Sequence, residues 1–169
     1  FVYLTHGTLF GDLAFMLGKP AKKIKLFSVS TQMERRALLG EAYGYGEDEV
    51  ALMGMARYDA YGSAQTRKKI AFLPTWRSNI AGKIIPGTST REYVHHFKST
   101  DFWKFYNALI NDERLLAAME RCGYTAEFYV HPAFEKQAGD FTGNALVAVG
   151  EGSADYERVL SESALMVTD

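Results

Sequence analysis

The chain has 169 residues, of which 47% are hydrophobic and 23% are charged, and its formal net charge is −1. This composition is typical of a globular protein with one domain or two small ones, and it excludes a strongly basic, nucleic-acid-binding chain. A single cysteine, Cys122, excludes an internal disulfide. No apolar run approaches the roughly 20 residues of a membrane span. No histidine–cysteine spacing indicates a metal site, and we expect neither metal nor cofactor.

Three short apolar runs in the first third of the chain predict strands at residues 1–4, 24–29 and 49–53. Thr31 and Glu34 have the spacing of a capping box, which predicts a helix that runs to about Tyr43 and ends at Gly44. Four lysines between residues 19 and 25 form a small basic patch. Such a patch is usually a solvated face, although it would also suit anionic lipid or a polyphosphate.

Residues 60–66 have the most linker-like composition in the chain, so we place a boundary between residues 66 and 67. Beyond it the pattern predicts strands at 70–73, 126–130, 145–149 and 165–168. A polar loop is expected at 78–90. Two helices are expected between 101 and 123, with their aromatic residues in the core, and a short helix is expected after its cap at Asp155. Strands that alternate with helices predict an α/β fold with a parallel, doubly wound sheet, and the first 66 residues resemble half of a similar domain. Because both chain ends fall at predicted strands, we expect a fragment of a longer protein.

Polar residues and glycines follow several predicted strands at the points where the strands end. They are His6 and Gly7, Arg57, Thr75 and Arg77, His131, and Asp169. Ligands of open α/β sheets bind at the carboxyl ends of the strands, so we expect these residues to line a cleft faced by two half-sheets.

Each assignment has a simpler alternative. A histidine such as His6 suits a general base toward a hydroxyl, but a lone histidine more often only makes local hydrogen bonds. The planar fork of Arg77 suits a phosphate, and the equally weighted alternative is an arginine paired with a surface carboxylate beside Trp76. Together with a protonated or hydrogen-bonding His131, Arg77 would hold a diphosphate and stabilise the charge of its leaving group.

A second motif, Gly150-x-Gly152 between a predicted strand and helix, has the context of a dinucleotide fingerprint. Asp155 stands at the position of the third glycine, and its carboxylate would repel a pyrophosphate. Neither a phosphate-binding P-loop nor a G-x-S-x-G elbow is present. The strand-end residues therefore indicate transfer from a nucleotide-diphosphate donor rather than hydride chemistry.

Five segments, in this order, resemble the CDP-glycerol glycerophosphotransferase family of teichoic acid synthesis. They are Val2–Gly7, Gly54–Asp59, Phe72–Arg77, Phe128–Pro132 and Glu162–Asp169. The resemblance runs over nearly the whole chain, and the His-Gly and Pro-Thr-Trp-Arg pieces together carry most of it.

The resemblance implies a GT-B architecture, with two Rossmann-like domains and an active site between them. Residues 1–66 would be the C-terminal part of the first, acceptor-side domain, and residues 67–169 the N-terminal part of the second, nucleotide-donor-side domain. An acceptor hydroxyl would attack the β-phosphate of CDP-glycerol or another CDP-polyol and release CMP. His6 would be the catalytic base, and the residues that would bind substrate or donor are Gly7, Arg57, Thr75, Arg77, His131 and Asp169.

The resemblance also implies where the protein works and on what. The acceptor would be a polyol-phosphate or lipid-linked polymer of the cell envelope, and the enzyme would bind peripherally to the cytoplasmic face of a bacterial membrane, where the lysine patch would have a use. Unpaired sheet edges would also allow a homo-oligomer.

The chain departs from the family pattern in two places. Ala56 stands where the family has proline, which would loosen that turn. The chain stops at Asp169, before a Tyr-Ser-Ser loop that contacts donor phosphate in the family, so we expect it to be inactive alone. Two alternatives stay open: a nucleotide-sugar glycosyltransferase of the same fold, and a non-catalytic domain that binds a nucleotide or an envelope partner.

Overall fold

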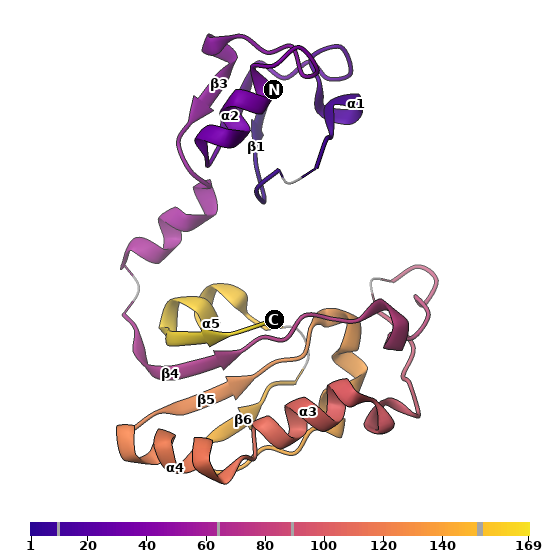
Figure 1. Cartoon of the computed structure of the whole chain (residues 1–169), viewed down its shortest axis with the longest axis vertical. Coiled ribbons are helices and arrows are strands. Elements are labelled where there is room, and N and C mark those ends of the chain that lie inside the picture. The colour runs from indigo at the N-terminus through magenta and orange to yellow at the C-terminus, as the bar shows by residue number, and fades with distance from the viewer. Residues whose placement is uncertain (10, 64, 89, 152–153) are drawn as a thin grey trace. The chain divides into compact units, whose positions relative to one another are not determined.

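The chain forms two compact units, Phe1–Ser63 and Ala64–Asp169, in a computed structural model (Figure 1). The structure describes residues 1–9, 11–63, 65–88, 90–151 and 154–169. Each unit has its own parallel sheet and its own hydrophobic core.

The N-terminal unit is built on a three-stranded parallel sheet in the order β1-β2-β3. Its strands are β1 (Val2–Leu4), β2 (Leu26–Val29) and β3 (Val50–Leu52), and its helices are α1 (Ala14–Leu17), α2 (Gln32–Leu38) and a 3₁₀ turn, η1 (Glu47–Glu49). The three predicted strands are confirmed with shorter bounds. The central strand β2 supplies Phe27 and Val29 to the core, where they pack with Leu38 of α2.

Helix α2 begins as predicted and ends earlier than predicted. The capping box of Thr31 and Glu34 is present, with the Thr31 hydroxyl accepting from the Glu34 N–H at 3.2 Å. The helix stops at Leu38 rather than at Tyr43, because the chain turns at Gly40 and buries Tyr43 in the core. Gly44 does adopt the left-handed conformation, with φ of +73°, but in the turn that follows the helix.

The C-terminal unit contains a four-stranded sheet in the order β6-β5-β4-β7, and every neighbouring pair is parallel. Its strands are β4 (Arg67–Phe72), β5 (Thr125–Phe128), β6 (Val147–Val149) and β7 (Ser163–Val167). The chain winds outward from β4 through β5 to β6 and then crosses back to place β7 on the other side of β4. This is the beginning of the doubly wound order, so the predicted α/β class with Rossmann-like parallel sheets is confirmed. The cleft between two domains stays a prediction.

The α-helices in the described part of this unit are α3 (Asp101–Leu109), α4 (Glu113–Cys122) and α5 (Tyr156–Glu162). The predicted break between α3 and α4 is confirmed, because Asp112 caps α4 by accepting from the N–H groups of Arg114 and Leu115. Gly123 ends α4 with φ of +72°. Asp155 caps α5, as expected, by accepting from the Arg158 N–H at 3.1 Å.

Further 3₁₀ turns, which local sequence patterns do not specify, lie between the predicted strands and helices. They are η2 (Ala56–Ser63), η3 (Ser78–Ile80), η4 (Phe97–Ser99) and η5 (Pro132–Asp140). The predicted polar loop at 78–90 contains Ile84, which pairs with Arg91 in an antiparallel bridge. A Cβ atom on Gly82 would lie 2.2 Å from the Glu92 carbonyl oxygen, so the crossing of the two arms requires glycine there.

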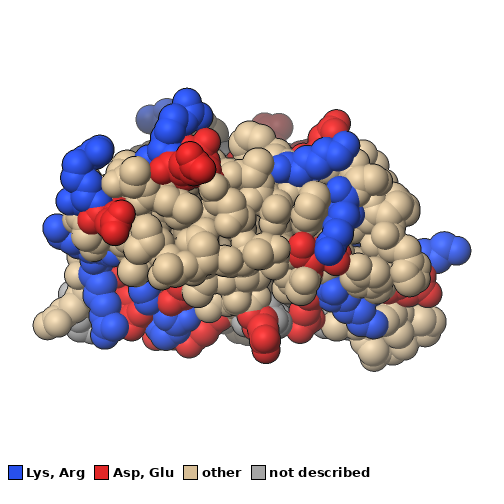
Figure 2. All heavy atoms as spheres, turned by 90° about the horizontal axis from the view of Figure 1, so that it is seen from below, with Lys and Arg blue, Asp and Glu red and all other residues tan. Residues whose placement is uncertain are grey.

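Charges of both signs share the face that Figure 2 shows. Blue basic and red acidic side chains alternate around a mostly uncharged area, without a broad basic field on that face. Among the described residues, no helix combines the length and apolar character needed to cross a membrane.

Candidate functional site

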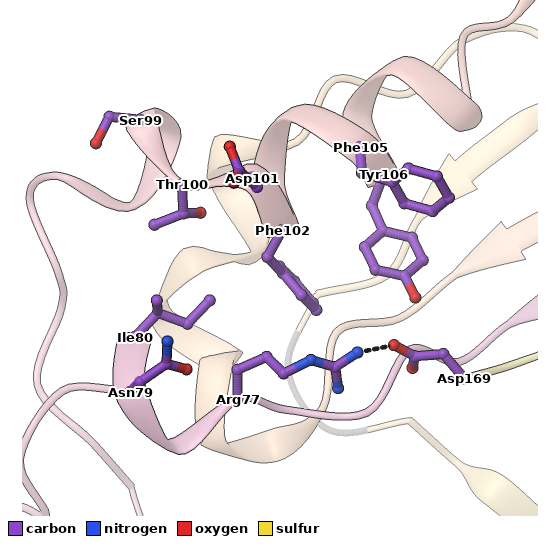
Figure 3. A pocket seen from close by; sticks show the side chains of 10 residues that line it. All are labelled: Arg77, Asn79, Ile80, Ser99, Thr100, Asp101, Phe102, Phe105, Tyr106 and Asp169. Atoms are coloured by element: carbon purple, nitrogen blue, oxygen red, sulfur yellow. Dashed lines mark hydrogen bonds and ion pairs between the residues drawn. The ribbon is translucent and has the colours of Figure 1, made fainter.

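Thr75, Arg77 and Asp169 form one hydrogen-bonded cluster beyond the carboxyl ends of β4 and β7. The Asp169 Oδ1 atom accepts from the Thr75 backbone N–H at 2.8 Å and from the Thr75 hydroxyl at 3.2 Å. The other carboxylate oxygen pairs with Arg77 Nη2 (Figure 3). Arg77 Nη1 donates to the Thr75 hydroxyl at 2.8 Å. Strands β5 and β6 are added on one side of β4, and β7 is then added on its other side. The cluster lies between β4 and β7, where this direction reverses, and open α/β sheets bind ligands at such a switch point.

The cluster forms because β4 and β7 stay together past the ends of the strands. The Leu73 N–H donates to the Val167 carbonyl at 2.8 Å, and the Thr168 hydroxyl donates to the Leu73 carbonyl at 2.8 Å. These two hydrogen bonds carry Thr75 alongside Asp169. The position of the cluster is therefore set by sheet pairing rather than by a flexible loop.

A tyrosine that the sequence analysis assigned to the core completes the cluster. The Tyr106 hydroxyl points toward Asp169 from α3 (Figure 3). Burial raises the pKa of Tyr106 to about 12, and the nearby Asp169 carboxylate adds to the shift, so the hydroxyl stays protonated. Burial alone would raise the pKa of Asp169, but hydrogen bonds from Thr75 and Arg77, with the Tyr106 hydroxyl close by, lower it to about 2.

The cluster borders a pocket of about 700 Å³. Its walls are the segment after β4, the start of α3 and Asp169, and Figure 3 shows Arg77 and Phe102 reaching into the same space. Sites for small molecules usually measure about 300–1,000 Å³ and combine aromatic walls with a few fixed polar groups. A nucleotide-sized ligand would fit such a site.

The structure places His131 beside Trp76, the residue between Thr75 and Arg77. The two rings stack with centroids 6.0 Å apart and an interplanar angle of 25°. Burial lowers the pKa of His131, and its Nδ1 atom accepts from the Ala133 N–H at 3.1 Å. The ring is therefore neutral near pH 7 with its proton on Nε2, which favours the hydrogen-bonding form of the prediction over the protonated one.

The remaining predicted site residues, His6, Gly7 and Arg57, belong to the N-terminal unit. His6 is exposed two residues after β1, and Arg57 is exposed after β3, so both lie past the carboxyl ends of strands of one sheet. A Cβ atom on Gly7 would meet nothing within 4 Å, and its φ is not in the left-handed region. Within the unit, nothing therefore requires glycine at this position.

Packing explains the first glycine of the Gly150-x-Gly152 motif. A Cβ atom on Gly150 would lie 1.9 Å from the Tyr129 ring, so the ring needs glycine beneath it. Gly152 lies outside the described residues. Within the described part of the chain, no group of three His, Cys, Asp or Glu side chains is arranged to hold a metal ion.

Comparison with known proteins gives the family. The model of the family described as CDP-glycerol:poly(glycerophosphate) glycerophosphotransferase matches residues 16–169. The chain is also 32% identical over 169 residues to the minor teichoic acid biosynthesis protein GgaB of Bacillus subtilis (strain 168). The chain belongs to the CDP-glycerol:poly(glycerophosphate) glycerophosphotransferase family.

The two matches differ in what they cover. The alignment with GgaB covers 100% of this chain but only 19% of GgaB, so the chain spans about a fifth of the length of that relative. The glycerophosphotransferase match begins after His6 and Gly7, whereas the GgaB alignment includes both. No solved structure matches the chain.

In this member of the family, two residues near the cluster were not identified as site residues from the sequence. Tyr106 was missed because its helical spacing is equally typical of a core residue; its position one turn after Phe102 was the available signal. Arg91, whose guanidinium carbon lies 4.9 Å from the centre of the Trp76 ring, was missed because only the pairing of Ile84 with Arg91 brings it there.

Proposed function

We propose that this chain is part of an enzyme that moves polyol phosphate from CDP-glycerol or a related CDP-polyol onto a teichoic acid or similar envelope polymer and releases CMP. Family membership supports a glycerophosphate-transferring enzyme. The structural observation that carries the proposal is the cluster of Thr75, Arg77 and Asp169 at the switch point of the C-terminal sheet. There the guanidinium is fixed on two sides before any ligand binds, so little side-chain freedom is lost on binding.

In the proposed reaction, an acceptor hydroxyl oxygen forms a bond to the β-phosphorus of the donor. The bond from that phosphorus to the bridging oxygen breaks, and CMP leaves with the electron pair. His6 takes the hydroxyl proton, while Arg77 and the Nε2–H of His131 stabilise the charge on the leaving phosphate. Gly7 and Arg57 serve the acceptor side, and Thr75 and Asp169 hold Arg77 in position.

We place the protein peripherally at the cytoplasmic face of the membrane, with a polyol-phosphate or lipid-linked acceptor. The basic patch supports this placement in part: Lys19 pairs with Glu49 at 2.6 Å, whereas Lys22, Lys23 and Lys25 are exposed. A homo-oligomer remains a prediction based on sheet edges, such as β7 with its exposed Leu165 and Met166.

Thermal unfolding of the full-length protein with CDP-glycerol, CDP-ribitol, UDP-glucose and CMP tests the proposal. A ligand that binds only the folded state raises its stability, by about 2.7 kcal/mol at a hundred times its Kd. We expect a higher Tm with a CDP-polyol and a smaller rise in the Arg77→Lys variant, which keeps the charge but loses the fork. Arg121→Lys, an exposed position on α4, is the matched control and should behave as wild type.

Other outcomes would contradict the proposal. A rise with UDP-glucose alone would identify a nucleotide-sugar glycosyltransferase of the same fold. No rise with any of the four compounds would favour a non-catalytic domain.

A further inference from the structure

Glu34 makes more hydrogen bonds than a capping box requires. As the third residue of α2 its Oε2 atom accepts from the Thr31 N–H at 2.9 Å, the Thr31 hydroxyl at 3.0 Å and the Ser30 N–H at 3.1 Å. These contacts complete the cap at the start of the helix. The cap therefore uses only one of the two carboxylate oxygens.

The second oxygen, Oε1, reaches a distant segment of the chain. It accepts from the Leu9 N–H at 3.0 Å, across a separation of 25 residues. The Glu34 side chain is almost fully buried, and the hydrogen bonds from Leu9, Thr31 and Ser30 outweigh the effect of burial and lower its pKa. An ionised carboxylate buried at this depth persists because both of its oxygens are hydrogen-bonded.

The bond to Leu9 closes the loop that carries His6. On one side of His6, Leu4 is paired with Ser28 of β2, and Thr5 is buried. On the other side, Leu9 is held by Glu34 and packs against the N-terminal core. Only His6, Gly7 and Thr8 lie between the two anchors, so the place of His6 depends on both.

We propose that Glu34 is a positioning residue for His6, acting through the Leu9 amide rather than on the substrate. This inference rests on the role of His6 in the proposed function. A base held within hydrogen-bonding reach of the acceptor contributes fully, whereas a displacement of about 1 Å can cost on the order of 10²-fold in rate. Loss of the Leu9 bond therefore lowers kcat, while the KM for the donor, which we assign to the C-terminal unit, stays the same.

Two substitutions of Glu34 and one control separate positioning from capping. In Glu34→Gln only the amide oxygen accepts hydrogen bonds, and the three donors of the cap hold it there. The amide nitrogen, which cannot accept, then faces the Leu9 N–H. Glu34→Asp keeps the charge and suits the helix start but is one methylene shorter, so it loses reach to Leu9. Thr31→Ala removes the cap hydroxyl and leaves the Leu9 bond in place, which makes it the matched control for a weaker helix start.

The first readout is amide hydrogen exchange in the full-length protein. Exchange at Leu9 should be faster in both Glu34 variants and unchanged in Thr31→Ala. A Leu9 amide that stays protected in Glu34→Gln and Glu34→Asp would overturn the tether.

The second readout is the rate of CMP release. We expect kcat to fall about tenfold or more in both Glu34 variants, with the KM for CDP-glycerol within about twofold of wild type, and Thr31→Ala to keep a wild-type kcat. Adding Glu34→Gln to His6→Ala should cause no further loss, because the two act through the same base. Equal losses of kcat in Glu34→Gln and Thr31→Ala would overturn the positioning role. So would a double variant of His6→Ala and Glu34→Gln whose loss of kcat equals the sum of the two separate effects on the activation free energy. A His6→Ala variant with wild-type rate would instead overturn the role of His6 in the proposed function, while Leu9 exchange still decides the tether.

Discussion

Packing within the N-terminal unit does not require a glycine at position 7. A methyl group there would contact nothing within 4 Å, and the backbone conformation is one that alanine adopts. If Gly7 allows close approach of a substrate beside His6, its importance should appear only when substrate binds.

We therefore predict that Gly7→Ala leaves the free energy of unfolding within about 0.5 kcal/mol of wild type, or raises it slightly. The same variant should lower kcat/KM for transfer by tenfold or more. Urea unfolding and a transfer assay on the full-length protein measure the two effects. Gly139→Ala, at another glycine with open space around its Cβ position, serves as control. Unchanged transfer by Gly7→Ala would show that the glycine has no part in the site.

The strand-end residues of the site could be predicted from the sequence, whereas the residues that surround them could not. The run Pro74-Thr75-Trp76-Arg77 directly follows a buried strand, so its place at the carboxyl edge of the sheet could be predicted. Tyr106 could not, because it comes from a helix whose packing onto the sheet decides which side chains reach Asp169. The hydrogen bond between Glu34 and Leu9 could not be predicted either, because the capping-box pattern indicates only contacts within four residues of Glu34.

A charged network joins α5 to β4 and β5. Glu127 accepts from Lys69 at 2.8 Å and from Arg158 at 2.9 Å, while Lys69 also donates to Glu162 at 2.9 Å. Lys69 and Glu127 are largely shielded from solvent, with side-chain exposures of 14% and 19%. Each charge in this network needs its partners, because removing one leaves another partly buried and unpaired.

The prediction at this scale is that Glu127→Gln lowers the free energy of unfolding by about 1–3 kcal/mol. Glu120→Gln on α4, an exposed glutamate, is the matched control and should change it by less than about 0.5 kcal/mol. Chemical denaturation of both variants checks the difference. Equal effects would mean that α5 is held by its apolar contacts alone.

Elements with strong local signals were predicted well, and those defined by tertiary contacts were not. The caps at Thr31, Asp112 and Asp155 fix helix starts through side chains two or three residues away, which a sequence shows directly. The end of α2 depends instead on Tyr43 turning into the core, and η5 begins where His131 caps it after β5. Such contacts depend on partners that are distant in the sequence.

For the whole molecule, several carboxyl groups have pKa values below their usual range. Hydrogen bonds from Arg158 and Lys69 lower the pKa of Glu127 to about 2, and those of Asp169, Glu34 and Glu162 are also lowered. A carboxyl group whose folded pKa is depressed stabilises the fold above its unfolded pKa, which is about 4. That stabilisation is lost as the pH falls through the folded value.

We predict that the free energy of unfolding falls steeply between about pH 4 and pH 2. A smaller fall should begin below about pH 6.5, because His131 gains a proton in the unfolded chain more readily than in its buried site. Urea unfolding at a series of pH values measures this profile. The Glu127→Gln variant should lose less than wild type over the acidic range, because one of the groups that would be protonated is already neutral. A profile that is flat down to pH 2 in wild type would contradict the assigned pKa shifts.

The measurement that tests the transferase proposal most directly is CMP release by the full-length protein supplied with CDP-glycerol and a glycerophosphate-polymer acceptor. We predict acceptor-dependent release of CMP, and a loss of about 10²-fold or more in rate for His6→Ala at unchanged Tm. No CMP release from CDP-glycerol or CDP-ribitol, or equal rates in wild type and His6→Ala, would contradict the proposed reaction and the base assigned to it.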